Sequence, residues 1–150
     1  MKSEGLVSGP SGDEEEVLSR LRSAGDRVTT SRRLLVHCLF EASGHRTAEE
    51  LAAEIQAQAP DVSISTVYRN LEELERLGIV THAHLGHGPA TYHLATRQHG
   101  HLVCEECGVT VEIPVSLFAS LRRQATTRFG FEVDPGHSAV LGRCRDCRGH

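Results

Sequence analysis

The chain of 150 residues has no tryptophan, one methionine and only two tyrosines. Aromatic packing therefore contributes little to its core. No apolar run approaches the roughly 18 to 20 residues that a membrane span needs, and the first ten residues lack the charged-then-apolar layout of a signal peptide. We expect a cytoplasmic protein with no membrane partner.

Lysine is also scarce, since Lys2 is the only lysine among 16 basic residues. The net charge of −4 argues against a protein that coats polyanions indiscriminately, but it permits a local basic surface that meets DNA. Arginines crowd one short stretch, at Arg20, Arg22, Arg27, Arg32 and Arg33. On this observation alone the stretch is either a DNA-facing patch or a solvated helix surface.

The first half of the chain has the pattern of four helices and a hairpin. A Gly- and Ser-rich disordered tail is expected at 1–12, and helical spacing and capping signals predict helices over 13–25, 31–43, 47–55 and 63–78. Thr47 and Glu50 form a capping box at the start of the third. Strand-like runs at 79–84 and 90–94 predict a hairpin. Together they predict a winged helix-turn-helix DNA-binding domain over 13–94.

The second half has a different pattern. The polar residues 95–100 end in glycine and suit a hinge, and 101–150 form a small domain. Strands are expected at 101–103, 109–113, 131–133 and 138–141, with a helix that begins at Pro114 and ends at Gly130. A domain of about 50 residues with few large apolar side chains has a small core, so its folding needs a stabilising cross-link such as a metal site, a partner subunit or both. The fold class is therefore α+β, a winged helix followed by a small α/β dimerisation domain.

Four of the five cysteines form two Cys-x-x-Cys pairs in this second domain. A structural zinc ion takes four thiolate or imidazole ligands, and each such pair supplies two of them from one tight turn. The pattern predicts a four-cysteine zinc site, with a redox dithiol or a vestigial pair as alternatives. Its members are Cys104, Cys107, Cys144 and Cys147. Cys38 lies between apolar helix neighbours and is assigned to the core.

The histidines indicate further metal sites, because six of the ten fall between residues 82 and 101. Residues two apart on a strand project from the same face, so each His-x-His pair can chelate an ion. The two pairs are His82 with His84 and His99 with His101. His45 and His137 could complete either site by folding, although each alone is more often a surface histidine. We treat His37, His87, His93 and His150 as structural or incidental.

The fourth predicted helix carries the candidate DNA contacts. Hydroxyl groups suit phosphates, and a guanidinium suits a guanine edge. These groups cluster in the first turns of the helix, at Ser65, Thr66, Tyr68 and Arg69. The alternative is an ordinary amphipathic helix with Tyr68 half-buried.

These features together resemble the ferric uptake regulator (Fur) family of metal-dependent repressors, over about residues 15–148. The motifs occur in family order: residues 28–33, the recognition helix at 65–69, the His-x-His after the wing and the two Cys-x-x-Cys pairs. The resemblance implies a homodimer on a double-stranded DNA operator, with Arg33 among the DNA contacts. Such a repressor would control genes of metal uptake or homeostasis.

The run from Thr81 to Leu94 looks most like the nickel-responsive (Nur) branch of that family. By this resemblance His82, His84 and His137 bind the regulatory Ni²⁺, and a second regulatory site is formed by His45, His99 and His101. The sequence departs from the family at 97–101, Arg-Gln-His-Gly-His, where relatives often have a longer histidine run. No cysteine lies between 79 and 103, which disfavours zinc sensing, and missing thiolate and carboxylate ligands make a strictly Zn²⁺ or Fe²⁺ role less natural.

In the mechanism that we expect, Zn²⁺ builds the dimer domain and a second ion sets the angle between domains. Two recognition helices must lie about 34 Å apart to enter successive major grooves. Within the family, a zinc, iron or peroxide sensor is the alternative. A zinc metallohydrolase is disfavoured because no HExxH motif is present. A metal-storage protein would not require the winged-helix half.

Overall fold

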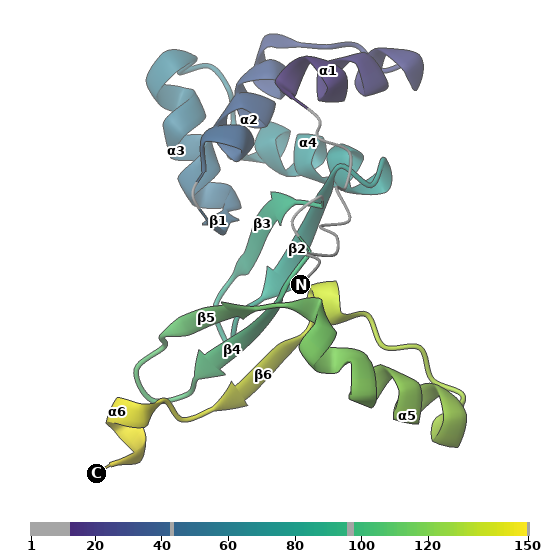
Figure 1. Cartoon of the computed structure of the whole chain (residues 1–150). Helices are drawn as coiled ribbons and strands as arrows, with labels where there is room; N and C mark the ends of the chain where they lie inside the picture. Colours follow the sequence, from purple (N-terminus) through teal and green to yellow (C-terminus); the bar gives the residue numbers. More distant parts are fainter. Residues whose placement is uncertain (1–12, 43, 96–97, 150) are drawn as a thin grey trace, which may run out of the picture.

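The structure is a computed structural model that describes residues 13–42, 44–95 and 98–149. Helices and a small sheet make up the first half, and a second sheet with one long helix makes up the other half (Figure 1). The expected tail at 1–12 lies outside the described residues. No helix in the described ranges is long and apolar enough to cross a membrane.

Four helices form most of the first half: α1 (Glu14–Ser23), α2 (Thr30–Glu41), α3 (Ala48–Gln58) and α4 (Ile64–Arg76). Each follows a residue whose side chain accepts a hydrogen bond from a free N–H of the first turn: Asp13, Thr29, Thr47 and Ser63. The predicted capping box is confirmed, because the Thr47 hydroxyl accepts from the Glu50 N–H while the Glu50 carboxylate accepts from the Thr47 N–H. The helices therefore begin where the sequence places a capping side chain.

The predicted hairpin is present as β2 (Val80–His84) and β3 (Ala90–Leu94), paired antiparallel. A further strand, β1 (Arg46–Thr47), extends this sheet in the order β1-β3-β2. It was not predicted, because two residues are too few to show an alternating pattern. Helices and hairpin together form the predicted winged helix.

The second half is built on the central strand β4 (Gly100–Cys104), which pairs antiparallel with β5 (Thr110–Ile113) and parallel with β6 (Ala139–Gly142). The other elements are η1 (Val115–Phe118), α5 (Ala119–Phe129), η2 (Pro135–His137) and α6 (Arg145–Arg148). The predicted strand at 131–133 is wrong. The Phe131 N–H instead bonds to the Ala125 carbonyl at the end of α5, and the chain then runs on as a loop.

Packing differs sharply between the halves. The main apolar core joins α1 to α4 with β2 and β3, around fully buried residues such as Leu35, Leu51 and Leu71. Phe118 is the largest buried apolar side chain of the second half. Among the described residues, the exposed large hydrophobic ones other than Ile64 and Tyr68 lie in the second half: Leu102, Val109, Val111, Leu117, Leu121, Phe129, Phe131, Val140 and Leu141. The expected shortage of core in this half is therefore present.

Candidate metal centres and nucleic-acid interface

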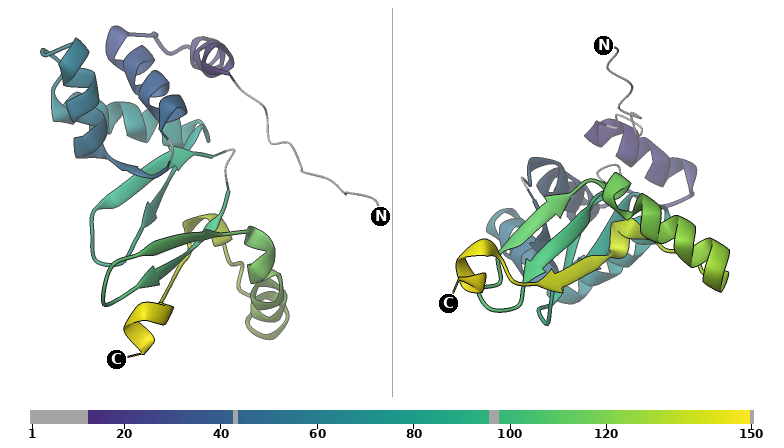
Figure 2. Two further views of the ribbon diagram at one scale, coloured as in Figure 1. Left: turned by 60° about the vertical axis from the view of Figure 1, so that its left-hand side comes forward. Right: turned by 60° about the horizontal axis from the view of Figure 1, so that its bottom comes forward.

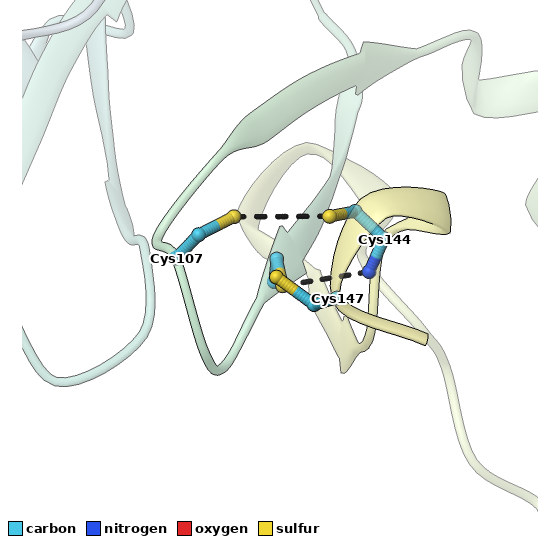
Figure 3. A group of neighbouring side chains, drawn as sticks. Cys107, Cys144 and Cys147 are labelled. Atoms are coloured by element: carbon cyan, nitrogen blue, oxygen red, sulfur yellow. Dashed lines mark hydrogen bonds between the residues drawn. The ribbon is translucent and has the colours of Figure 1, made fainter. Parts of the chain in front are cut away.

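The four paired cysteines meet at one end of the second sheet. Cys104 is the last residue of β4, and Cys107 lies in the turn that follows. Cys144 directly precedes α6, and Cys147 lies within it. Their four sulfur atoms lie within 4.8 Å of one another. Figure 3 shows the thiols of Cys107 and Cys144 directed at each other, 3.8 Å apart, with Cys147 beside them. Thiolates about 2.3 Å from a tetrahedral zinc ion are about 3.8 Å apart, so the cluster fits structural zinc.

Backbone groups prepare this cluster for a cation. The N–H groups of Cys107 and Cys144 lower the pKa of Cys104 to about 6, and the Cys144 N–H lies 3.4 Å from the Cys104 sulfur. Hydrogen bonding to Cys144 raises the pKa of Cys147 instead. The lowered pKa favours the thiolate form of Cys104, which is the form in which a cysteine binds a metal ion.

Three histidines converge where the two halves of the chain meet. His45 comes from the connection between α2 and β1, whereas His99 comes directly before β4 and His101 is its second residue. The Nε2 atom of His45 lies 3.0 Å from that of His99 and 2.9 Å from that of His101. These are the three histidines that the resemblance implied for a second regulatory site, and their ligand atoms lie within 4.8 Å of one another.

The short distances between the Nε2 atoms of these histidines are better explained by a shared metal ion than by hydrogen bonds. A neutral imidazole nitrogen has either one hydrogen or one lone pair, so the His45 Nε2 cannot make two good hydrogen bonds at once. Two nitrogens bound at about 2.0 to 2.1 Å from one ion lie about 2.9 Å apart at the right angles of a square-planar or octahedral site, and about 3.3 Å apart in a tetrahedral site. The three rings therefore fit a common metal ion.

Two further residues border this histidine cluster, and the sequence analysis missed both. The Glu112 carboxylate lies 3.6 Å from His45 Nδ1 and 3.5 Å from His99 Nε2. The His93 ring, on β3, lies 4.7 Å from the His45 ring and 4.8 Å from the His99 ring, between centroids. Glu112 is opposite His101 in the β4–β5 register, so pairing the two predicted strands would have found it. An oxygen ligand is thus available here, contrary to the expectation that carboxylates are missing.

Burial favours the neutral form of two rings of this cluster, His45 and His101. Desolvation, with His101 and His99 nearby, lowers the pKa of His45 to about 4, and Glu112 opposes the shift. Desolvation also lowers the pKa of His101, which is fully buried. Metal-binding imidazoles must be unprotonated, so these two rings are already in the required state at neutral pH.

The second predicted histidine group lies on the wing. His82 and His84 project from the same face of β2, with ring centroids 5.5 Å apart. Strand β2 packs against η2, the short helix that ends at His137. The side chain of His137 lies outside the described part of the structure. The fold therefore brings the backbone segments of this predicted site together, and the set His82, His84 and His137 stays a prediction.

A third group of possible ligands, Glu14, His37 and Glu41, lies on the surface between α1 and α2. The His37 Nδ1 is 2.7 Å from the Glu14 carboxylate, and this hydrogen bond raises the pKa of His37. An ordinary surface ion pair accounts for this arrangement, and we assign it no metal.

The first turns of α4 expose the predicted DNA contacts. Ser65, Tyr68 and Arg69 are exposed and Thr66 is half-buried. Arg69 donates a hydrogen bond of 3.4 Å to the Thr66 hydroxyl, and the Tyr68 hydroxyl donates one of 2.8 Å to the Glu49 carboxylate on α3. These side chains share one accessible end of the helix, as a recognition helix requires.

Fewer arginines of the arginine-rich stretch are free to contact DNA than the sequence suggests. Arg32 donates hydrogen bonds to the side chain of buried Asn70 on α4 and to the Arg27 carbonyl, so it braces α4 against α2. Arg20 donates to the Leu77 carbonyl, and Arg22 pairs with Glu15. Arg33, in contrast, is exposed. Much of the expected basic patch therefore stabilises the domain, and Arg33 stays the candidate DNA contact.

Comparisons with known proteins agree with this architecture. A model of the ferric uptake regulator family matches residues 23–137. The peroxide-responsive repressor PerR of Staphylococcus aureus is 29% identical over 134 residues, 89% of this chain and 90% of PerR. The ferric uptake regulator of Pseudomonas aeruginosa with manganese has a TM-score of 0.68 and 28% identity, covering 85% of this chain and 97% of that one. The Helicobacter pylori regulator Fur, at 22% identity, shares the fold with a TM-score of 0.76, covering 91% and 95% of the two chains. The chain therefore belongs to the ferric uptake regulator family.

Proposed function

We propose that this protein is a homodimeric, metal-sensing transcriptional repressor that binds double-stranded DNA in the cytoplasm. The observation that carries the proposal is the meeting of His45, from the winged-helix half, with His99 and His101, from the other half. A shared metal ion supplies coordinate bonds that join the two halves. The histidines would then restrict motion at the hinge proposed for 95–100.

The wing histidines extend the same logic. His82 and His84 would act with His137, on the other side of the β2–η2 contact, as a second clamp between the domains proposed at 13–94 and 101–150. Both clamps would favour one spacing of the two recognition helices. A coupling of about 1 to 3 kcal/mol between metal and operator binding corresponds to a change of about 5- to 150-fold in operator affinity.

An exposed apolar surface supports the homodimer. Val111, Leu102 and Val140 are neighbours across β5, β4 and β6, and their exposed fractions are 50%, 42% and 46%. Leu117 in η1 and Leu121 in α5 are also exposed, and Figure 2 shows α5 extending away from the rest of the chain. Surfaces of this kind usually mark a partner site. A second copy of the chain would cover them.

For the cysteine cluster we propose structural zinc, and for the wing site nickel. Imidazole ligands suit Ni²⁺, and no cysteine adjoins either histidine group to favour zinc sensing, as judged from the described residues. The sequence likeness to the nickel-responsive branch of the family points the same way.

Glu112 favours one alternative, an iron-dependent peroxide sensor. A carboxylate beside the His45 cluster adds an oxygen donor, which suits Fe²⁺ or Mn²⁺ more than Ni²⁺. PerR of Staphylococcus aureus, named as peroxide-responsive, is a relative over most of the chain. In this alternative, peroxide added to the metal-loaded protein would weaken its binding to DNA.

Metal competition tests the choice between these functions. Protein purified without added metal is dialysed against equal, limiting nickel and zinc, and its metal content and visible spectrum are recorded. A nickel sensor retains nickel beyond one zinc per chain, with an absorption band that disappears in His82→Ala. Zinc alone in the second site would place the protein among zinc sensors. No second ion would contradict metal sensing by these histidines.

A further inference from the structure

We propose that Glu75 is a positioning residue, which orients the His82 ring and links the wing metal site to the recognition helix. The inference rests on the proposed metal-binding role of His82. Glu75 lies in the last turn of α4, and its carboxylate contacts His82 Nδ1 on β2. Both side chains are only partly exposed, 30% for Glu75 and 37% for His82.

The position of Glu75 on its helix is unfavourable without such a partner. The C-terminal end of a helix carries partial negative charge, so a carboxylate in the last turn is repelled. Glu73, in the same turn, is paired with Arg76. Glu75 is paired with His82 instead, so the contact compensates a cost that the helix imposes.

This contact determines which ring nitrogen faces the metal. A carboxylate accepts a hydrogen bond, so Nδ1 of His82 carries the proton and Nε2 is the nitrogen that would bind an ion. Carboxylates that orient metal-bound histidines in this way are conserved parts of metal sites, and their loss typically weakens metal binding by about 10- to 100-fold. Glu75 therefore acts on the metal through His82 and not as a ligand.

The backbone makes the link between α4 and β2 stiff. Only residues 77–79 separate the two elements, and the Gly78 N–H bonds to the Glu75 carbonyl at 2.9 Å. The Ile79 N–H bonds to the Leu74 carbonyl, also at 2.9 Å. Gly78 allows this tight turn through its positive φ of 68°. A change in the orientation of His82 is consequently passed to the helix that carries Tyr68 and Arg69.

The test uses the full-length dimer with its cysteine site loaded with zinc and nickel(II) alone as the probe. Equilibrium dialysis measures nickel affinity for wild type, Glu75→Gln and His82→Ala. Glu72→Gln is the matched control, because it removes an exposed carboxylate from the same helix one turn earlier. Glu75→Gln should lower nickel affinity about 10- to 100-fold at unchanged zinc content, and Glu72→Gln should change it by about twofold or less.

A second readout needs no substitution. In nickel-free wild type, nitrogen-15 NMR of the histidine rings should show His82 with its proton on Nδ1. A proton on Nε2, or equal losses of nickel in Glu75→Gln and Glu72→Gln, would overturn the positioning role. If His82→Ala loses nickel and Glu75→Gln does not, the positioning role of Glu75 is wrong and the metal-binding role of His82 stands. If His82→Ala retains nickel, the wing site itself is wrong.

Discussion

The Phe118 ring lies directly against the backbone of Gly100, so closely that a β-carbon at residue 100 would be 2.2 Å from the Phe118 Cε2 atom. Gly100 separates His99 from His101, and Phe118 is buried at the end of η1. The glycine in this His-Gly-His sequence is therefore required by packing. The position of the histidine cluster depends on an aromatic ring that forms no part of it.

Substitution of Gly100 by alanine should disturb both the second half and the histidine cluster. The ring of Phe118 would have to move, and overpacking of this kind costs typically about 1 to 3 kcal/mol of unfolding free energy. Urea denaturation and nickel and zinc stoichiometry measure the two effects. Gly142→Ala is the control, since a β-carbon there meets no atom within 4 Å. Equal stability of the two variants would contradict the packing role of Phe118.

Much of the first half could be predicted from the sequence, because its signals are local. Capping side chains such as Thr47 and Ser63 mark the helix starts, and apolar spacing marks the buried faces. The second half was harder. The region 131–133 has apolar residues at strand spacing, but the Phe131 N–H bonds to the Ala125 carbonyl at the end of α5, and no strand in the described part of the chain pairs with this region.

The cysteine site should be essential to the second half. Replacement of Cys147 by serine removes one ligand, and the loss of a site worth about 10 to 16 kcal/mol of apparent binding free energy should leave this half unfolded. Zinc analysis and far-UV circular dichroism give the readouts, with sedimentation for the dimer. Cys38→Ala removes a cysteine from the first half and should keep one zinc per chain. A zinc-free Cys147→Ser that stays folded and dimeric would show that zinc binding by the cysteines is not needed to stabilise the second half.

Arg69 should contribute to sequence-specific binding. Its removal in Arg69→Ala should weaken operator binding by about 1 to 3 kcal/mol and relax the preference at one base pair. Fluorescence anisotropy against an operator selected from random duplex DNA measures both. Arg76→Ala, at the other end of α4, should leave affinity nearly unchanged because Arg76 pairs with Glu73. Unaltered affinity in Arg69→Ala would remove Arg69 from the interface.

The His45 cluster should make stability depend on pH. An unfolded histidine has a pKa of about 6.5, and burial lowers that of His45 to about 4, so the unfolded state binds more protons between these values. The free energy of unfolding should therefore fall as the pH drops from about 6.5 towards 4, and be independent of His45 above that range. Urea titrations at pH 7 and 5.5, without a second metal, should show a smaller change in His45→Gln. Identical pH dependence in both proteins would contradict the buried, neutral state of His45.

The candidate sites were predictable to different degrees. The Cys-x-x-Cys pairs specify their own ligands, because each pair supplies two corners of a tetrahedron from one turn. The histidine cluster needed tertiary information. His93 looked incidental because only the packing of β3 against the α2–β1 connection brings its ring beside His45. The sequence left open whether the stretch that contains Arg32 faces DNA or solvent, because the hydrogen bond from Arg32 to Asn70 joins residues 38 positions apart.

Operator affinity as a function of nickel concentration tests the central claim most directly. The zinc-loaded dimer is titrated onto the selected operator with and without nickel, in wild type, His84→Ala and His99→Ala. The account predicts that nickel raises wild-type affinity by about 5- to 150-fold, and that both variants keep their zinc and their dimer but lose the increase. Wild-type affinity that is the same with and without nickel would contradict nickel sensing, and variants that respond like wild type would contradict sensing through these histidines.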